Sequence, residues 1–244
     1  MNQNSVEPEV KKIIPSHRKD ADSTVRIKGM AEEEEGNEVT EILKRFFKRQ
    51  ANSVLPKIGA GAEWWDAERW DSELADDLAP VMMTIADRHG EDTAKQIGMD
   101  YVKELTAAYL RKMAEGRATA INTSTQEKLE EAIADDEMDP AEVFEKRESN
   151  DAVSYGLSLA TAVASWSTLE AVHQAQDNGF TKKTEKEWVT GYNPRPTHAA
   201  MNGERVPINE RFSNGADWPG DDSLEPAEKC RCNCSTAVII TWED

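Results

Sequence analysis

Apolar residues recur at helical spacing through much of the chain, but only after a polar start. Residues 1–36 carry the acidic run "AEEEEG" and almost no apolar periodicity, so they bury too little surface to offset the entropy that ordering costs. From Glu38 onward apolar residues recur every three or four positions, beginning with Val39, Ile42, Leu43, Phe46 and Phe47. That spacing places them on one face of a helix. We therefore predict a disordered acidic tail over residues 1–36 and a helical region over residues 37–178.

Breaking residues indicate where the first helices of this region end. We expect the first helix to end before Pro56, because proline cannot donate the backbone hydrogen bond that a helix interior requires. Glycine also interrupts helices, so a second helix is expected to end at Gly90 and a third at Gly116. The segment "TSTQEKLEEAIAD", which begins with Thr and Ser, predicts a further short helix.

Capping residues mark the last two helices of the region. In "MDPAEVFEKR", Asp139 is suited to the N-cap and Pro140 to the first helical position. The Ala-rich segment 150–178 predicts one long helix, because alanine has the highest helix propensity. Gly179 would close it in the left-handed conformation.

The residue pattern changes completely after Gly179. Gly, Pro, Asn and Asp are scattered between three short extended candidates, "KEWVT", "ERVPI" and "TAVIITW". Asn202 and Gly203 favour a tight turn, so "MNGERVP" predicts a hairpin. The large aromatic side chains expected in the core of this segment are Trp188, Phe212, Trp218 and Trp242. The chain is therefore predicted to be α+β, with a small loop-rich α+β domain over residues 179–244 behind the mainly helical region.

Charge and composition argue against two classes of partner, nucleic acids bound along their backbone and membranes. With 47 acidic and 29 basic residues the net charge is -18, which opposes general binding to a phosphate backbone. A local nucleic-acid contact at residues 181–187, with Arg195 and Arg205, competes with the simpler interpretation of a solvated strand edge. No stretch approaches the roughly 18 apolar residues that a membrane span needs, and no hydrophobic signal segment leads the sequence. We expect a protein that stays in the cytoplasm and does not contact a membrane.

The sequence contains one candidate metal site. All three cysteines, Cys230, Cys232 and Cys234, lie near the C-terminal end, which does not fit a disulfide framework. Together with His198 they make the four sulfur and nitrogen donors that a structural, tetrahedral zinc ion takes. The spacing is so tight that one of the three thiols can point away. The alternative is that His198 hydrogen-bonds a nearby loop and the thiols are buried and reduced.

A catalytic interpretation has less support in the sequence. A nucleophilic cysteine needs a base and an orienting group, and a catalytic zinc needs an open coordination position with a carboxylate beside it. Asp217, Asp221 and Asp222 are available, but their spacing does not tie them to His198. We therefore predict that the protein is not an enzyme.

The C-terminal segment carries a set of residues in a characteristic order. They are Trp188 and Thr190, Arg195 and His198, Asn202 and Gly203, Phe212, the run Pro219, Gly220 and Asp221, and then the cysteine cluster before a strand. This succession resembles the C-terminal domain of phage head-morphogenesis (minor head) proteins of the Mu F-like family. Asn193 stands where that family often has Asp, and the position of His198 can hold Cys in related sequences. The helices over roughly residues 40–110 further resemble the helical extension of phage portal proteins that carry this domain.

The resemblance implies a function and a set of partners. It implies a minor head protein that acts in prohead assembly at or near the portal vertex, is packaged in the virion and is linked to DNA ejection. Its partners would be the portal protein and the major capsid or scaffold protein, with a local contact to packaged DNA and no small-molecule substrate. It would be found in the host cytoplasm during assembly. Two alternatives stay open: the C-terminal portion of a portal-type protein, and an enzyme carried in the phage head, either a toxin-like transferase or a zinc hydrolase.

Overall fold

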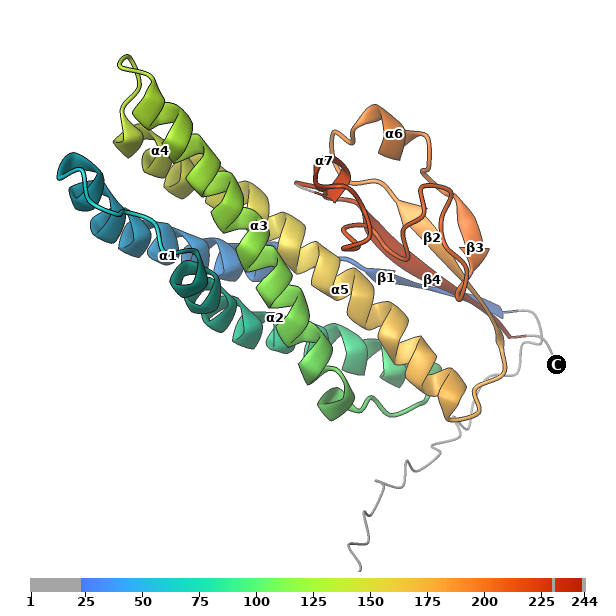
Figure 1. Ribbon diagram of the computed structural model, residues 1–244. Helices are drawn as coiled ribbons and strands as arrows, with labels where there is room; N and C mark the ends of the chain where they lie inside the picture. Colours follow the sequence, from blue (N-terminus) through green and yellow to red (C-terminus); the bar gives the residue numbers. More distant parts are fainter. Residues whose placement is uncertain (1–22, 230, 243–244) are drawn as a thin grey trace, which may run out of the picture.

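Long helices packed side by side form one part of the molecule, and a small antiparallel sheet covers one side of them (Figure 1). This computed structural model describes residues 23–229 and 231–242. Its helices are α1 (Glu33–Gly59), α2 (Ala67–Ile97), α3 (Ala107–Ala134), α4 (Pro140–Lys146), α5 (Ala152–Asp177), α6 (Pro196–Ala199) and α7 (Pro226–Lys229). Its strands are β1 (Ser23–Gly29), β2 (Lys183–Val189), β3 (Arg205–Pro207) and β4 (Ser235–Trp242). This mainly helical chain with a strand-containing C-terminal region confirms the predicted α+β class.

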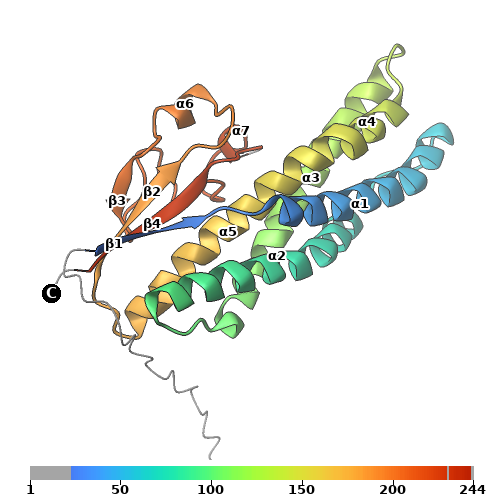
Figure 2. The same cartoon turned by 180° about the vertical axis from the view of Figure 1, so that it is seen from behind.

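The sheet joins the two ends of the described chain. Its strand order is β1-β4-β2-β3, and every neighbouring pair is antiparallel. In the β1–β4 pair, Val25 lies opposite Ile240 and Ile27 lies opposite Val238. Figure 2 shows β1 leading from the sheet directly into α1. The C-terminal segment 179–244 therefore does not complete its own sheet, because an edge strand comes from the other end of the sequence.

The predicted tail over residues 1–36 needs correction. Residues 1–22 lie outside the described residues, but residues 23–36 are part of the fold. In β1 the exposed Arg26 and Lys28 alternate with the half-buried Val25 and the buried Ile27, which is the two-residue period of a strand with one buried face. This short alternation was the sequence signal for a strand.

The acidic run begins a helix instead of extending a tail. Glu33, Glu34 and Glu35 form the first turn of α1, where carboxylates interact favourably with the helix dipole. Glu35 is buried, and its side chain accepts a hydrogen bond of 2.9 Å from the backbone N–H of Glu32 in a capping box. It also accepts a 2.9 Å hydrogen bond from Arg88 on α2, and the His89 ring nitrogen Nε2 lies 3.0 Å from it. The carboxylate thus links the start of α1 to α2.

The expected helix ends at Pro56, Gly90 and Gly116 were wrong, since α1, α2 and α3 continue through these positions. A side chain at Gly90 would collide with the ring of Tyr101, so this glycine serves packing. The glycine that ends α2 is Gly98, whose φ of 72° is left-handed.

The later helices agree better with their predictions. The segment 123–135 is the second half of α3 and not a separate helix. The Asp139 side chain caps α4 by accepting a 2.8 Å hydrogen bond from the N–H of Ala141, as expected. The long helix predicted over 150–178 is confirmed as α5, and Gly179 follows it with a φ of 88°. A π-helical turn, Arg147–Asp151, joins α4 to α5.

Helix α5 connects the bundle to the sheet. The Ser165 hydroxyl donates a 2.7 Å hydrogen bond to the carbonyl of Gly29 in β1 and accepts a 3.1 Å hydrogen bond from the N–H of Thr236 in β4. Leucine and valine side chains of α5 share a buried cluster with apolar residues of both strands. The helical region and the C-terminal segment therefore share a core. Among the helices in the described part of the chain, none has the length and apolar composition needed to cross a membrane.

Candidate metal centre

The connection from β2 to β3 and the segment just before β4 bring His198, Cys232 and Cys234 together. His198 lies on α6, within the connection from β2 to β3, and the two cysteines come just before β4. In both ribbon views α6 lies beyond the sheet, away from the helical bundle, whereas α7 lies nearer to the bundle (Figures 1 and 2).

Asn202 and Gly203 form the predicted tight turn, since the N–H of Glu204 donates a 2.8 Å hydrogen bond to the carbonyl of Met201 and Gly203 has a φ of 82°. The turn does not join two strands directly, because β3 pairs with β2 across the connection that contains α6.

The donor atoms of these three residues are close enough to share one ion. The Nδ1 atom of His198 lies 3.4 Å from Sγ of Cys232 and 3.6 Å from Sγ of Cys234. All three donor atoms lie within 4.8 Å of one another. Zn–S bonds of about 2.3 Å and Zn–N bonds of about 2.1 Å at tetrahedral angles place sulfur and nitrogen ligands about 3.6 Å apart. The described residues therefore fit part of a tetrahedral site, and the same distances also suit hydrogen bonds between the imidazole and the thiols.

Glu228 lies on the other side of the imidazole. Its Oε2 atom lies 2.8 Å from Nε2 of His198, which leaves Nδ1 facing the sulfurs. Metal-ligating histidines usually contact a carboxylate or carbonyl through the nitrogen that does not bind the metal, and this contact sets the tautomer. The arrangement at His198 has this form.

The centre is buried among the aromatic residues of the small module. His198, Cys232 and Cys234 are 1%, 5% and 3% exposed. The ring of Trp188 meets the His198 ring edge-on at 5.1 Å and the Phe212 ring at 5.2 Å. Because the module is small, these rings supply much of its apolar core. The expectation that Trp188 and Phe212 belong to the core is confirmed.

Local backbone geometry turns both cysteines inward. Cys232 and Cys234 are two positions apart just before β4, and their sulfur atoms lie on the same side, within 4.8 Å of each other and of the His198 donor atom. A side chain at Gly191 would collide with the backbone of Asn233, so glycine allows the connection after β2 to lie against the cysteine segment. Asn193, with a φ of 51°, takes the left-handed conformation in the same connection. Cys230, the other predicted ligand, lies outside the described residues.

The two thiols differ in acidity because they interact with each other. A hydrogen bond from Cys232 lowers the pKa of Cys234, and the backbone N–H of Gly191 and the His198 side chain lower it further. The same thiol–thiol hydrogen bond, together with burial, raises the pKa of Cys232. The contact therefore favours ionisation of Cys234 over ionisation of Cys232. Thiolate is the form that binds metal ions.

The nearby aspartates are engaged elsewhere. Asp221 accepts hydrogen bonds from the backbone N–H groups of Asp217 (2.7 Å) and Ser223 (2.9 Å) and so shapes its own loop. Asp222 lies 3.3 Å from the guanidinium of Arg117 on α3. Asp217 lies 3.7 Å from Nζ of the buried Lys186. None of these contacts directs a carboxylate to His198.

The basic residues singled out in this region also have acidic neighbours. Arg205 donates a 2.7 Å hydrogen bond to Glu187, which also accepts one of 2.8 Å from Arg26 on β1. Lys183 lies 3.6 Å from Glu185. Residues 183–187 belong to β2, which lies between β4 and β3, and Lys186 is buried, so the solvated strand edge expected for this segment was wrong.

Comparison of the chain with models of protein families, with curated proteins and with solved structures finds no match. Any functional conclusion therefore depends on the residues of this chain and on how the fold arranges them.

Proposed function

We propose that this protein is a phage minor head protein that acts in prohead assembly at or near the portal vertex and is packaged in the virion. Its partners are the portal protein and the major capsid or scaffold protein, with a local contact to packaged DNA and a link to DNA ejection. It has no chemistry of its own, and its C-terminal module is stabilised by a structural zinc ion.

One observation carries this proposal: residues of the Mu F-like succession that are far apart in sequence pack against one another. Trp188, His198 and Phe212 make edge-on ring contacts, and Cys232 and Cys234 lie in the same buried cluster. A chance succession of common residue types would not be expected to converge on one core. The convergence supports the resemblance as the mark of a single folded module.

The three donors line a hollow of about 350 Å³, but their low exposure favours a structural role over a catalytic one. A catalytic zinc keeps a coordination position open to substrate, whereas structural zinc sites are closed by protein ligands. His198 and both described thiols are almost completely buried. Cys230 completes the predicted ligand set, and the ion would hold α6 and the start of β4 together.

Mass spectrometry of purified particles tests the role in assembly. We expect the protein in proheads, or in complexes recovered with the portal protein, at a constant ratio to the portal. A matched preparation from a phage that lacks this gene controls for host contaminants. Absence from both particles and portal complexes would overturn the assembly role and leave the metal centre untouched.

Elemental analysis of the full chain tests the zinc ion. We expect about one zinc per chain after purification with added zinc, and a loss of thermal stability on chelation, because metal-binding energy contributes to folding. His198→Ala and Cys234→Ser should lose the ion, whereas His198→Cys should keep it, since it retains a donor at that position. Asn233→Ala, a change between the two cysteines, is the control. Zinc-supplemented protein without stoichiometric metal would refute the centre.

A further inference from the structure

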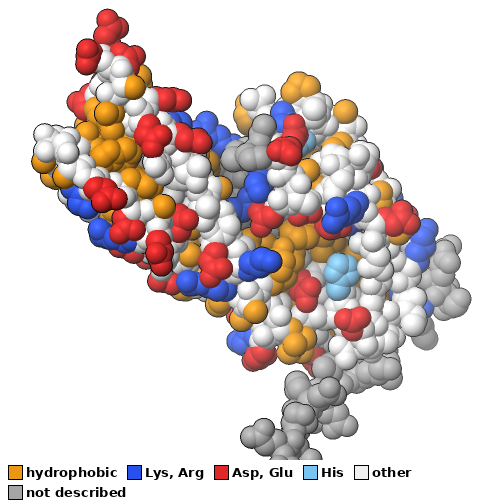
Figure 3. All heavy atoms as spheres, in the orientation of Figure 1, with side chains coloured by type: hydrophobic (Ala, Val, Ile, Leu, Met, Phe, Trp, Pro, Cys, Tyr) orange, Lys and Arg blue, Asp and Glu red, His pale blue; other side chains and the backbone are white. Residues whose placement is uncertain are grey.

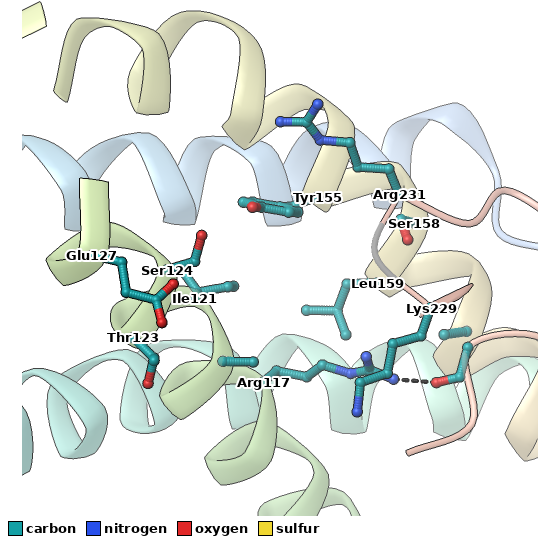
Figure 4. A pocket seen from close by; sticks show the side chains of 13 residues that line it. Arg117, Ile121, Thr123, Ser124, Glu127, Tyr155, Ser158, Leu159, Lys229 and Arg231 are labelled. Carbon is teal, nitrogen blue, oxygen red and sulfur yellow. Dashed lines mark hydrogen bonds between the residues drawn. The ribbon is translucent and has the colours of Figure 1, made fainter. Parts of the chain in front are cut away.

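A cavity lies between the helical bundle and the C-terminal loops, outside the metal centre (Figure 4). Its volume is about 410 Å³, within the size range of ligand-binding pockets. Ile121 on α3 and Leu159 and Ala162 on α5 supply apolar lining. Lys229 and Arg231, next to the cysteine segment, line it from the side of the C-terminal loops. The cavity therefore combines an apolar helical wall with a basic edge.

The edge of the cavity carries an excess of positive charge. Arg117, Lys229 and Arg231 line it, against the single carboxylate of Glu127. Arg117 donates a hydrogen bond to the carbonyl of Gly220, while its buried Nε atom has no acceptor among the described residues. A buried donor without an acceptor is rare in folded proteins. In a chain with a net charge of -18, this edge is a local concentration of basic side chains.

The carboxylates behind the lining do not cancel this charge. Asp151 is shared by three cations: Arg147 at 2.9 Å, Lys128 at 3.7 Å, and Arg231. Asp222 is likewise shared, by Arg117 at 3.3 Å and Lys229 at 3.5 Å. Cations therefore outnumber carboxylates around the cavity.

Unusual backbone geometry holds the cavity wall in place. Arg147 and Asp151 belong to the π-helical turn before α5, and such turns are frequent at functional sites. The fully buried Arg147 donates hydrogen bonds of 3.0 Å to the hydroxyls of Tyr155 and Ser124, both of which line the cavity. Arg231 takes a left-handed φ of 57°, a conformation that costs energy for a residue with a side chain.

The end of α3 and the connection to α4 have the opposite character, and we call residues 130–139 the acidic tip. It contains six carboxylates and no basic residue. Its two large apolar side chains, Ile133 and Met138, are 43% and 46% exposed. Figure 3 shows acidic side chains gathered at this end of the bundle. The acidic tip thus presents apolar side chains surrounded by negative charge.

We propose that the acidic tip of one copy of this protein docks into the cavity of a second copy. Ile133 and Met138 would enter the apolar part, and the surrounding carboxylates would meet the cations at its edge. A chain cannot dock its own tip, because Thr123 at the cavity and Ile133 lie on the same rigid helix, about 15 Å apart. The two surfaces of the contact are different, so repeated docking generates a ring or an open chain of copies. This contact does not depend on the proposed function.

Matched variants at each surface test the contact by analytical ultracentrifugation of the full chain. Ala120 is exposed and lines the cavity, so Ala120→Glu should repel the acidic tip and weaken self-association by about tenfold or more, whereas Ala120→Lys should not weaken it. Ile133→Ser with Met138→Ser should weaken it as well. Leu105→Ser, which changes an exposed apolar residue outside both surfaces, should have no effect.

Mixing the two defective proteins separates this contact from other modes of association. The Ala120→Glu protein keeps an intact tip and the Ile133→Ser, Met138→Ser protein keeps an intact cavity, so the mixture should form heterodimers although each protein alone is monomeric. Circular dichroism of each variant checks that it is folded. A wild-type protein that stays monomeric at all concentrations, or association that survives both sets of changes, would overturn the proposal.

Discussion

Two glycines inside helices provide a matched test of how closely α1 and α5 approach. A Cβ atom at Gly156 on α5 would collide with the Thr40 hydroxyl and lie 2.6 Å from the carbonyl oxygen of Gly36 on α1. A Cβ atom at Gly116 on α3 would meet nothing closer than Oδ2 of Asp222, at 4.0 Å. Both positions are helical, so the intrinsic preference for alanine over glycine is the same at each. Only the space around them differs.

The expected effects of Gly116→Ala and Gly156→Ala therefore have opposite signs. Alanine in place of an interior helical glycine stabilises by about 1 kcal/mol, which is the whole effect expected at Gly116. At Gly156 the Thr40 side chain can rotate away, but the Gly36 carbonyl is backbone and forces the helices apart. We estimate that this overpacking costs about 3 kcal/mol of stability. After the gain of about 1 kcal/mol from helix propensity, the net loss of stability is about 2 kcal/mol. For a chain of this size, Tm should rise by about 2–4 °C at Gly116 and fall by about 4–8 °C at Gly156.

Thermal and urea unfolding followed by far-UV circular dichroism measure both effects. The wild-type chain and the two variants should be compared at the same protein concentration, because self-association raises apparent stability. If Gly156→Ala is as stable as wild type, the close approach of α1 and α5 is wrong.

Three further predictions concern the metal centre, the edge strand and a helix cap. Because a hydrogen bond and burial raise the pKa of Cys232, zinc must displace at least the proton of this thiol, so zinc affinity should rise at least tenfold per pH unit near neutrality; competition with a chromophoric chelator measures this, and a pH-independent affinity would contradict it. Ile27→Ala should cost about 2–4 kcal/mol in urea unfolding because Ile27 is buried, whereas the exposed Lys28→Ala should change little; equal effects would argue against the β1 register. Asp66→Ala removes the side chain that caps α2 and should lower the free energy of unfolding, measured in urea, by about 1 kcal/mol. Unchanged stability would contradict this role of Asp66.

Local sequence signals were sufficient where the structure depends on neighbouring residues. Asp139 and Pro140 predict the start of α4 because a cap and the first helical position need only adjacent residues. The long Ala-rich helix and its terminal Gly179 follow from propensity and from the left-handed conformation that glycine tolerates. The strands β2, β3 and β4 overlap the extended candidates of the C-terminal segment, although their ends differ.

Tertiary contacts decided the features that local patterns left open. The strand β1 is short, and its partner β4 lies at the other end of the chain. The alternation of exposed and buried residues in β1 could therefore be assigned to a strand only once the pairing between these distant segments was known. Gly90 resembles a helix stop in sequence, but the ring of Tyr101 shows that it is required for close packing. The ends of helices therefore depended on which glycine adopts a left-handed φ and which lies against a neighbouring side chain.

For the candidate site too, the sequence identified some features and only the fold decided the others. The sequence by itself identified His198, Cys232 and Cys234 as soft donors, because the ligand chemistry of a residue depends on its side chain alone. Only the fold places the Nδ1 atom 3.4 and 3.6 Å from the two sulfurs and sets Glu228 against the other ring nitrogen. The cavity lined by Arg117 and Arg231 had no sequence signal, because these two residues are more than 100 positions apart and its walls meet only after α3, α5 and the C-terminal loops have packed.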